Sequence, residues 1–425
     1  MSHLRKLLDG VEVSWMPLGA LGELVRGNGL QKKDFTETGV PAIHYGQIYT
    51  YYGLATAETK SFVSPELAKN LRKVDSGDVV ITNTSENLED VGKALVYLGK
   101  KQAVTGGHAT VFKPKAIISG KYFAYFSQTP IFADQKRKLA KGIKVIDVSA
   151  TDMAKISVPI PCPEDPKKSL AIQTEIVRIL DAFTAYTAEL TAELTAELTA
   201  RKKQYKYYLS QLLTFTEDEF EWKKLGDIGN FTYGYAAKAQ DTGDARFVRI
   251  TDIGTNGKLI GTDLKYVNLS EDNERYLLSR NDLLMARTGA TFGKTMIFKE
   301  DYPAIYAGFL IKLNLDCRVI NPKFYWHFAQ SDLYWDQAKK LVSGGGQPQF
   351  NANALAEVKV PIPYPCEPQK SLNEQARVVS MLDKFDALTN SISEGLPREI
   401  ELRQKQYEYY RDLLLSFPKP EEEAA

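Results

Sequence analysis

Cysteine is scarce in this chain. Cys162, Cys317 and Cys366 are the three thiols in 425 residues, and their spacing fits neither a disulfide framework nor a zinc site. No apolar run approaches the roughly 18 residues of a membrane-spanning helix. The segment 1–10 contains charged residues and lacks the apolar core of a secretory signal. These absences predict a cytoplasmic protein that does not enter a membrane.

Catalytic patterns are lacking as well. The segment 289–295 reads Gly-Ala-Thr-Phe-Gly-Lys-Thr, but a phosphate-binding P-loop has four residues between its glycines and this segment has three. The segment 321–324 resembles the Asn-Pro-Pro-Phe/Tyr box of amino-methyltransferases, but Lys323 replaces the second proline. No spacing typical of a metal site or a nucleophile dyad links the four histidines, which are His3, His44, His108 and His327. The residue pattern therefore predicts no catalytic residue and no metal site.

The chain contains an internal duplication. The tetrapeptide Val-Pro-Ile-Pro at 158–161 returns at 360–363, an offset of 202 residues (360 minus 158). The same offset relates the motif Gln-Tyr-x-Tyr-Tyr at 204–208 to that at 406–410. The parts that precede these segments match only faintly, through residues such as Trp15 and Trp222 at an offset of 207 (222 minus 15). A duplication that keeps its connecting segments and varies the parts between them is typical of a scaffold that presents two different surfaces.

A long helix is predicted from about Lys168 to Leu213. Apolar residues recur there at helical spacing, and the tetrapeptide Thr-Ala-Glu-Leu occurs three times over 187–198. Alanine, glutamate and leucine are strong helix formers, and a leucine at every fourth position keeps one face apolar. A low-complexity linker is the alternative interpretation of the repeat.

The apolar face of this helix requires a partner. The duplication supplies one in the second copy at 371–415, which Gly395 and Pro397 are expected to kink or interrupt. Apolar surface that the second copy leaves uncovered is expected to be buried in a further contact. The residues expected to make these spacer and subunit contacts are Ile172, Ile176, Ile179, Phe183, Leu190, Leu194, Leu198, Tyr208, Phe385 and Tyr410.

Each Thr-Ala-Glu-Leu unit has a defined helical geometry. Four residues advance a helix by about 6 Å and rotate it by about 400°, which is about 40° beyond a full turn. B-DNA rotates by about 34–36° per base pair. A helix that contains such units is therefore suited to set the distance between two DNA half-sites.

The two variable parts are predicted to contain both strands and helices. The apolar runs at 78–81 and 282–285 predict equivalent strands, and 322–330 predicts a helix. A Gly-Lys pair at 92–93 and again at 293–294 predicts a hairpin turn in each half.

Both variable parts carry amide, hydroxyl, aromatic and basic side chains in predicted loops, although 49–52 is equally compatible with a strand. Arg and Gln make bidentate contacts to base edges, and Lys contacts to phosphate give affinity without sequence information. Each residue taken alone is more typical of a solvated surface, and the net charge of +1 neither requires nor excludes nucleic acid. Their clustering in both halves favours DNA binding. The candidate residues are Lys32, Lys33, Tyr49, Tyr51, Asn83, Thr84, Lys93, Lys136, Arg137, Lys138 and Lys141 in the first half, and Tyr233, Tyr235, Lys238, Arg246, Arg249, Arg287, Thr288, Lys294, Ser343, Gln347 and Gln349 in the second.

These motifs resemble the specificity subunit of Type I restriction-modification systems over the whole chain. The most specific parts are the two Pro-Ile-Pro segments, the two Gln-Tyr-x-Tyr-Tyr segments and the Thr-Ala-Glu-Leu run, which is similar to the spacer of the IC subgroup. The resemblance implies an α+β protein with a pseudo-two-fold internal repeat. Two mixed α/β target-recognition domains would be joined by two long helices that pack as an antiparallel coiled coil.

The resemblance also implies a non-catalytic, sequence-specific DNA-binding subunit. Each recognition domain would read half of a bipartite target in double-stranded DNA, and the chain would scaffold two methyltransferase subunits and two motor-nuclease subunits. S-adenosylmethionine, ATP and Mg would bind those partners, and this chain would bind no cofactor. The expected segments are an N-terminal recognition domain (1–157), a first helical spacer (158–215), a C-terminal recognition domain (216–359) and a second helical spacer with a tail (360–425). The alternative is a stand-alone DNA-modifying enzyme, a methyltransferase or a nuclease, with unrecognised motifs.

Overall fold

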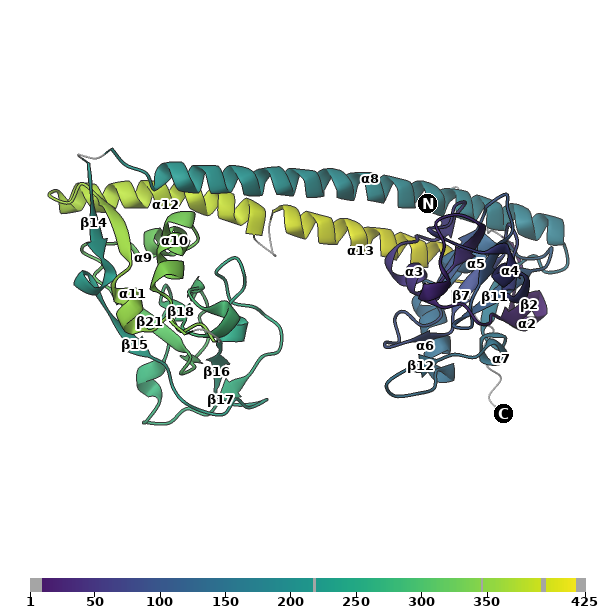
Figure 1. The fold of residues 1–425 in the computed structure, drawn as a ribbon, viewed down its shortest axis with the longest axis horizontal. Coiled ribbons are helices and arrows are strands. Elements are labelled where there is room, and N and C mark those ends of the chain that lie inside the picture. Colours follow the sequence, from purple (N-terminus) through teal and green to yellow (C-terminus); the bar gives the residue numbers. More distant parts are fainter. Residues whose placement is uncertain (1–9, 217–218, 345–346, 391–394, 418–425) are drawn as a thin grey trace. The chain divides into compact units, whose positions relative to one another are not determined.

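The chain forms two compact units (Figure 1). The structure is a computed structural model that describes residues 10–216, 219–344, 347–390 and 395–417. The first unit combines Met1–Thr191 with Leu402–Ala425, and the second is Ala192–Glu401. We call them unit 1 and unit 2. Each unit therefore joins one variable part of the sequence to portions of both long helical segments.

A two-stranded antiparallel ribbon frames the globular part of each unit. In unit 1, β1 (Val13–Pro17) pairs with β13 (Ser157–Pro161), and Trp15 lies opposite Pro159. In unit 2, β14 (Phe220–Lys224) pairs with β22 (Lys359–Pro363), and Trp222 lies opposite Pro361. The tryptophan and the Val-Pro-Ile-Pro motif that mark the duplication are thus the two strands of one ribbon. Proline is tolerated in these strands because each has a free edge that does not need its N–H.

Unit 1 contains two mixed sheets and a short ribbon. The larger sheet has the order β2 (Gly22–Arg26), β11 (Ala109–Pro114), β7 (Val79–Thr82), β9 (Ala94–Tyr97) and β4 (Ala55–Thr56). The smaller has the order β5 (Ser61–Val63), β3 (Val40–Ile43), β10 (Ala103–Thr105) and β6 (Arg72–Val74). The ribbon pairs β8 (Thr84–Ser85) with β12 (Ile146–Asp147). The pairs β3–β10 and β4–β9 are parallel and the rest of these sheets is antiparallel.

Unit 2 repeats the main sheet with four strands. Its order is β15 (Gly229–Tyr233), β21 (Leu310–Leu315), β18 (Leu283–Ala286) and β19 (Thr295–Ile297), and all pairs are antiparallel. A second sheet has the order β17 (Tyr266–Val267), β16 (Ala245–Val248) and β20 (Ala304–Tyr306), with β16 parallel to β20. The two predicted equivalent strands are β7 and β18. Gly92 and Gly293 precede the returning strands with φ of 77° and 76°, which confirms the predicted turns.

Short helices accompany the sheets. In unit 1 they are α2 (Leu18–Leu21), α3 (Tyr45–Thr50), α4 (Pro65–Asn70), α5 (Gly120–Phe126), α6 (Pro130–Leu139) and α7 (Ala150–Met153). In unit 2 they are α9 (Pro322–Phe328), α10 (Asp332–Leu341) and α11 (Ala352–Ala356), so the helix predicted at 322–330 is confirmed. Single 3₁₀ turns lie at Lys32–Asp34, Leu225–Asp227, Ile250–Asp252, Glu274–Tyr276 and Gly289–Thr291. The aromatic side chains of α5 and α9 fill the core between the main sheet and the long helices in their own units.

The predicted long helix is confirmed as α8 (Pro166–Leu212), which has 47 residues. The leucines of the repeat, Leu190, Leu194 and Leu198, are half-buried, whereas the alanine and glutamate residues between them are exposed. The leucine stripe is therefore the protected face of the helix. The helix is continuous through the whole repeat, so each residue of the repeat adds about 1.5 Å to the length of the helix.

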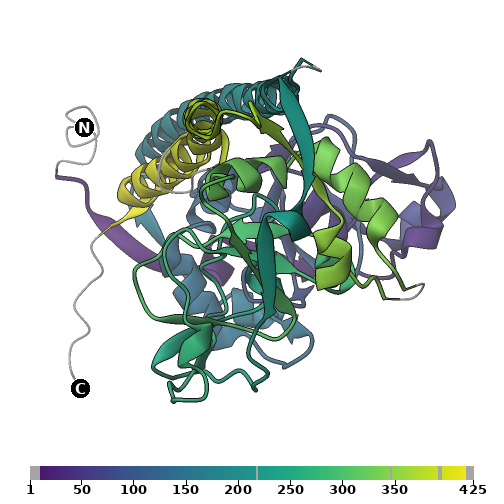
Figure 2. The same cartoon turned by 90° about the vertical axis from the view of Figure 1, so that its left-hand side faces the viewer.

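The two long helical segments run in opposite directions. In unit 1 the start of α8 shares a hydrophobic core with the end of α13 (Leu396–Leu415), and the rings of Phe183 and Tyr410 lie 5.8 Å apart. In unit 2 the end of α8 shares a core with α12 (Pro368–Asn390), and Tyr208 stacks on Phe385 at 5.1 Å. The helices α8 and α12 lie side by side in both views (Figures 1 and 2). The antiparallel packing implied by the family resemblance is confirmed. The offset of 202 residues relates Phe183 to Phe385 and Tyr208 to Tyr410, so the two aromatic pairs are equivalent.

The second helical segment is interrupted as predicted. Helix α12 ends at Asn390 and α13 begins at Leu396. Gly395 has φ of 82°, in the left-handed region that favours glycine. Pro397 lies in the first turn of α13, where its missing N–H has no intrahelical partner to lose.

Buried glutamines attach the long helices to the globular parts at equivalent positions. Gln173 on α8 accepts a hydrogen bond from one backbone N–H and donates to one backbone C=O in the loop before α5, both at 2.8 Å. Gln375 on α12 makes the same two contacts before α9, at 2.8 and 3.0 Å. Both side chains are fully buried. Each long helix is thereby fixed to the domain of its own unit by paired backbone groups.

A carboxylate about two turns further along the helix makes a second attachment in each unit. In unit 1, Asp181 accepts from Lys121 and from the Tyr125 hydroxyl, both at 2.8 Å. In unit 2, Asp383 takes the same place and lies 3.0 Å from Lys323 and 2.9 Å from Nε2 of His327.

His327 in unit 2 replaces Tyr125 and is itself buried between two partners. Its Nδ1 lies 3.2 Å from the Tyr205 hydroxyl of α8, and its Nε2 lies against Asp383. Burial raises the pKa of Asp383, but the hydrogen bonds from His327 and Lys323 outweigh it, and the pKa falls to about 2. The carboxylate therefore stays ionised at neutral pH and keeps this contact.

Candidate nucleic-acid interface

Two of the predicted segments fall at the same place in the two folds. The pairs 83–84 and 287–288 directly follow the equivalent strands β7 and β18. Beside each pair lies a hairpin: Asp147 pairs with Thr84 in unit 1, and Gln349 bridges Thr288 in unit 2. The hairpins span the predicted Lys141 and Ser343, and each contains a glycine with positive φ, Gly142 at 104° and Gly344 at 92°. Each unit thus carries one candidate surface, at an equivalent place in its fold.

In unit 1 this surface is a connected group of aromatic, hydroxyl and basic side chains. Tyr49 on α3 donates its hydroxyl hydrogen to the carbonyl of Thr84, and the Thr84 hydroxyl lies 2.8 Å from Nδ1 of His108. The His108 ring packs on Tyr45 at 4.8 Å, and Lys93 donates to the Tyr49 carbonyl at 3.4 Å. Burial raises the pKa of Tyr49, so its hydroxyl is a neutral donor at physiological pH. The group is held together by its own hydrogen bonds.

Arg26 lies at the edge of this group, at the end of β2. Its Nε donates to the Gly107 carbonyl at 3.1 Å, and its Nη2 lies 3.4 Å from the Asp147 carboxylate. Both side chains are solvent-accessible, so this ion pair contributes little to stability. The Asp147 carboxylate does orient the guanidinium of Arg26 and offset its positive charge.

In unit 2 the corresponding surface centres on Arg287. Its Nε donates to the Gly308 carbonyl at 3.2 Å, and its guanidinium lies over the rings of Tyr233 and Phe309, 5.2 and 5.4 Å from their centres. The Tyr233 hydroxyl accepts from the Ala352 N–H at 3.2 Å. Arg287 and Phe309 line an open hollow of about 670 Å³ that also includes Tyr235, Lys238 and Arg249.

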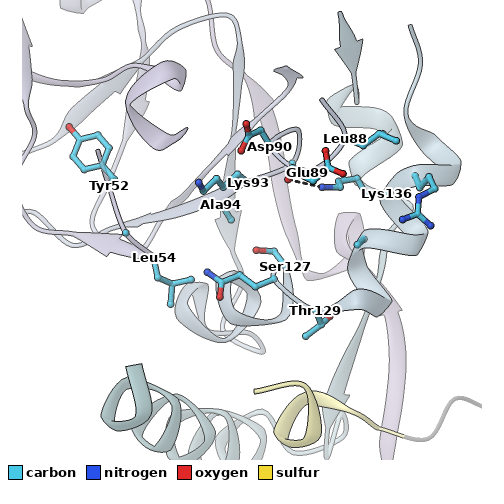
Figure 3. A pocket seen from close by; sticks show the side chains of 15 residues that line it. Tyr52, Leu54, Leu88, Glu89, Asp90, Lys93, Ala94, Ser127, Thr129 and Lys136 are labelled. Carbon is cyan, nitrogen blue, oxygen red and sulfur yellow. Dashed lines mark hydrogen bonds between the residues drawn. The ribbon is translucent and has the colours of Figure 1, made fainter. Parts of the chain in front are cut away.

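Lys136, one of the predicted DNA contacts, points into the domain (Figure 3). Its ammonium donates to the carbonyls of Glu89 at 3.3 Å and Val91 at 2.7 Å, and the residue is 7% exposed. Burial lowers the pKa of this lysine. Its side chain lines a hollow of about 510 Å³ together with Tyr52 and Lys93. The ammonium is thus engaged with the protein's own backbone.

Other predicted residues are also paired inside the protein. Arg246 is 7% exposed and donates to the Ile260 carbonyl and the Tyr302 hydroxyl. Arg249 is bound by the carboxylates of Asp252 and Asp263. The side chains of Asn83 and Thr288 are buried as well.

The remaining predicted residues lie at or near the surface. Those that are exposed are Lys32, Lys33, Tyr51, Lys93, Arg137, Lys138, Lys141, Tyr233, Lys238, Ser343 and Gln347. Those that are half-buried are Tyr49, Thr84, Tyr235, Arg249, Arg287, Lys294 and Gln349.

Two predicted loop segments are helical. Tyr49 lies in α3, where a loop or a strand was expected, and 136–138 lies in the last turns of α6. The residue before α3, His44, caps the helix by accepting a hydrogen bond from the Gly46 N–H, and a histidine cap is a weak signal in sequence. Three consecutive basic residues fit the C-terminal end of a helix because they offset its dipole.

Sequence reasoning missed Arg26, His108 and Phe309 as members of these surfaces. His108 and Phe309 are equivalent at an offset of 201 (309 minus 108), and each follows a glycine directly before β11 or β21. A residue that follows glycine at a strand entry in both halves is the signal that could have identified them.

The predicted contact residues of the long helices divide into two groups. Ile172 is 5% exposed and Ile176 is fully buried, and both lie in the core of unit 1 with Ile179 packed beside them. These side chains are covered by the chain itself, which corrects the expectation that they await a partner. Phe183 and Tyr208 remain partly exposed, at 38% and 37%.

Within the described residues, no group of three His, Cys, Asp or Glu side chains is arranged to hold a metal ion. None of the described helices is long and apolar enough to cross a membrane. The three cysteines are free thiols.

Comparisons with known proteins give consistent results. The family model for the Type I restriction modification DNA specificity domain matches the chain twice, at residues 11–200 and 217–402. The specificity subunit of the Type I restriction enzyme EcoR124I/EcoR124II from Escherichia coli is 37% identical, with 99% of this chain and 98% of that protein covered. A putative type I restriction enzyme specificity subunit from Haemophilus influenzae is 33% identical, with 98% of each covered.

Solved structures share the fold at low sequence identity. A chain from the structural study of complex assembly and conformational transition of the type I R-M system has a TM-score of 0.64 at 14% identity, with 95% of this chain and 97% of that chain covered. The HsdS subunit from Thermoanaerobacter tengcongensis has a TM-score of 0.51 at 13% identity, with 95% of each covered. The two family matches span most of the sequence. The chain therefore belongs to the family of Type I restriction-modification DNA specificity subunits, which bind DNA and are non-catalytic.

Proposed function

We propose that this subunit reads a bipartite target in double-stranded DNA, with one half-site for each recognition domain. The supporting observation is that the equivalent edges after β7 and β18 present different accessible side chains, His108 and Tyr49 in unit 1 and Phe309 and Arg287 in unit 2. One framework with two sets of side chains suits two different half-sites. Exposed lysines of unit 1, such as Lys93 and Lys138, supply phosphate contacts that add affinity without specificity.

A domain exchange tests this proposal. Replacing 15–154 with the matching segment of a related subunit should change one half of the methylated motif and leave the other half unchanged, because the reading residues of unit 2 are untouched. The reciprocal replacement of 222–356 is the matched control and should change only the other half. Sequencing of methylated bases in a strain that carries the complete system gives the motif. A change in both halves after a single exchange would contradict the proposal.

The Thr-Ala-Glu-Leu repeat sets the separation of the half-sites. Deleting 195–198 shortens α8 by about 6 Å and rotates its two ends relative to each other by about 40°, so the leucine stripe stays in phase to within about 40°. The translation alone corresponds to one to two base pairs and the rotation to about one. We expect a loss of one base pair between the half-sites, because a rotational error loses base contacts, whereas an axial error can be absorbed by bending of DNA.

The matched control for this deletion is Thr195→Ala, which keeps the length and helical phase. The half-sites themselves should stay the same in both variants, because no residue moves within its domain. An unchanged separation after the deletion, or altered bases in either half-site, would contradict the spacer role.

The long helices also scaffold two methyltransferase subunits and, for restriction, two motor-nuclease subunits. Tyr207 and Tyr409 are equivalent at the 202-residue offset and are 60% and 62% exposed. Two identical partners require the same contact twice, and a duplicated exposed tyrosine meets that requirement. S-adenosylmethionine, ATP and Mg belong to those partners, while this chain supplies recognition.

We assign the functional segments along the chain in accordance with this proposal. Residues 1–157 and 216–359 form the recognition domains, and 158–215 and 360–425 form the helical spacers and the tail. Family membership removes the alternative of a stand-alone modification enzyme. Purified chain mixed with S-adenosylmethionine and DNA, without partner subunits, should therefore transfer no methyl group.

A further inference from the structure

Arg287 differs from the other buried or half-buried arginines of unit 2 in how it is bound. Arg249 is neutralised by two carboxylates, and Arg246 is bound by a carbonyl and a hydroxyl. Within the described residues, the side chain of Arg287 has a single hydrogen bond, from its Nε to the Gly308 carbonyl, and no carboxylate partner. Its Nη1 and Nη2 groups are thus left to bind something outside the chain.

The guanidinium of Arg287 is nevertheless held in place. Tyr233 and Phe309 supply the two rings over which it lies, at 5.2 and 5.4 Å. The backbone is fixed too, because the Arg287 N–H donates to the Phe309 carbonyl at 3.1 Å and its carbonyl accepts from Phe350 at 2.7 Å. A side chain that is oriented before binding loses less conformational entropy when it forms a directional contact.

Unit 1 has a paired arginine at the equivalent carbonyl, although that arginine ends β2 and does not follow β7. There Arg26 donates its Nε to Gly107, the residue equivalent to Gly308, at 3.1 Å. Its Nη2 lies 3.4 Å from Asp147, whereas the equivalent residue in unit 2 is Gln349, which carries no charge. Each unit therefore has an arginine that donates to the equivalent carbonyl. Arg26 in unit 1 has a carboxylate beside it, and Arg287 in unit 2 does not.

We propose that Arg287 determines specificity by reading one guanine in the half-site of unit 2, an inference that rests on the proposed bipartite recognition. The two free Nη groups donate to O6 and N7 of guanine in the major groove, the pair of acceptors that matches a planar fork. A phosphate contact carries no sequence information, and lysine can make it as a point charge, whereas the bidentate contact to guanine requires the planar fork of arginine. The orientation set by Gly308, Tyr233 and Phe309 is what a base contact requires.

The test substitutes Arg287→Lys in the complete complex of this chain with its methyltransferase subunits. Discrimination against the other bases should fall by about tenfold to a hundredfold at one position of one half-site, because lysine keeps the charge and loses the fork. The other half-site should be unchanged. Arg280→Lys is the matched control, since Arg280 is exposed and paired with Asp301, and it should leave the motif intact. Competitive methylation of oligonucleotides that differ at single positions measures the ratios.

A second variant, Phe309→Ala, tests the orientation separately. Phe309 is 55% exposed, so its removal leaves the core intact, and the loss of discrimination should fall on the same base position as for Arg287→Lys. Full methylation specificity in Arg287→Lys would overturn the proposal, and so would a uniform loss of DNA affinity in Arg287→Ala that lysine restores, since that result identifies a phosphate contact. Loss of specificity in both half-sites would instead contradict the bipartite reading.

Discussion

Gln375 offers the sharpest test of how the recognition domain of unit 2 is fixed to its helix. The side chain is fully buried and makes three hydrogen bonds: it accepts from the Asn321 N–H at 2.8 Å and donates to the Val319 carbonyl at 3.0 Å and to Ser371 Oγ at 3.1 Å. Gln375→Leu keeps nearly the same volume and removes all three. It leaves one backbone N–H and one backbone C=O without their partner.

The magnitude follows from those two backbone groups. An unpaired buried polar group costs about 1–3 kcal/mol, and the loop that carries these two is partly buried, so the lower half of that range applies to each. The free energy of unfolding of unit 2 should therefore fall by about 2–4 kcal/mol. The leucine side chain adds apolar burial, which keeps the loss from rising further.

Denaturant unfolding and hydrogen exchange of the full chain in its complex provide the assay. Lost protection should be confined to α9, its preceding loop and the adjoining part of α12. Gln173→Leu is the matched variant in unit 1 and should move the loss to the loop before α5, where Gln173 makes the same contacts. Gln369→Leu on the exposed face of α12 is the surface control and should change stability by less than about 0.5 kcal/mol. A loss below that value for Gln375→Leu, or a loss spread over both units, would refute the reasoning.

Three further predictions concern charge and exposed surface. The pKa of Asp383 is about 2 in the folded chain and about 3.9 in an unfolded one. After allowance for its partial exposure, Asp383 contributes about 1–2 kcal/mol to the free energy of unfolding, and this contribution is present above about pH 4 and is lost as pH falls towards 2. Asp383→Asn should remove this pH dependence from acid-unfolding curves. Lys136→Met should leave the salt dependence of DNA binding unchanged because this ammonium is bound to backbone carbonyls, whereas Lys138→Ala should reduce the slope of log affinity against log salt by about one; equal slopes would contradict the assignment. The isolated chain should be poorly soluble and bind DNA weakly until methyltransferase subunits cover surfaces that include Tyr207 and Tyr409, and a well-behaved monomer that recognises its full target alone would count against this.

Several elements were predictable because their signals are local. The helix α8 follows from helix propensity and a leucine every four residues, and the break before α13 follows from Gly395 and Pro397. The strands β7 and β18 and the turns before β9 and β19 follow from apolar runs and Gly-Lys pairs. The duplication itself predicted that the two units would share a framework, because equal spacing of marker residues survives only where the structure is the same.

The candidate surfaces were predictable only in part. Among the predicted residues, the pairs 83–84 and 287–288 do occupy equivalent edges of the two main sheets, and their contact with DNA stays a prediction. Sequence could not tell which of these side chains face outward. Lys136 and Arg246 read as solvated charges, yet both are buried, because their partners come from residues 45 and 14 positions away.

What the sequence determined by itself was the repeat, the length and phase of the long helix, and the family. The length and phase of the helix depend on interactions between residues a few positions apart, and the repeat and the family are visible as matching residues along the chain. The tertiary structure alone decided that Arg26 meets Gly107, 81 residues away, and Asp147, 121 residues away, while Arg287 meets no carboxylate within the described residues. Contacts at such separations depend on how sheets and loops fold back on one another, and no local pattern encodes them. The difference between the paired Arg26 and the unpaired Arg287, which donate to equivalent carbonyls, therefore appears only in three dimensions.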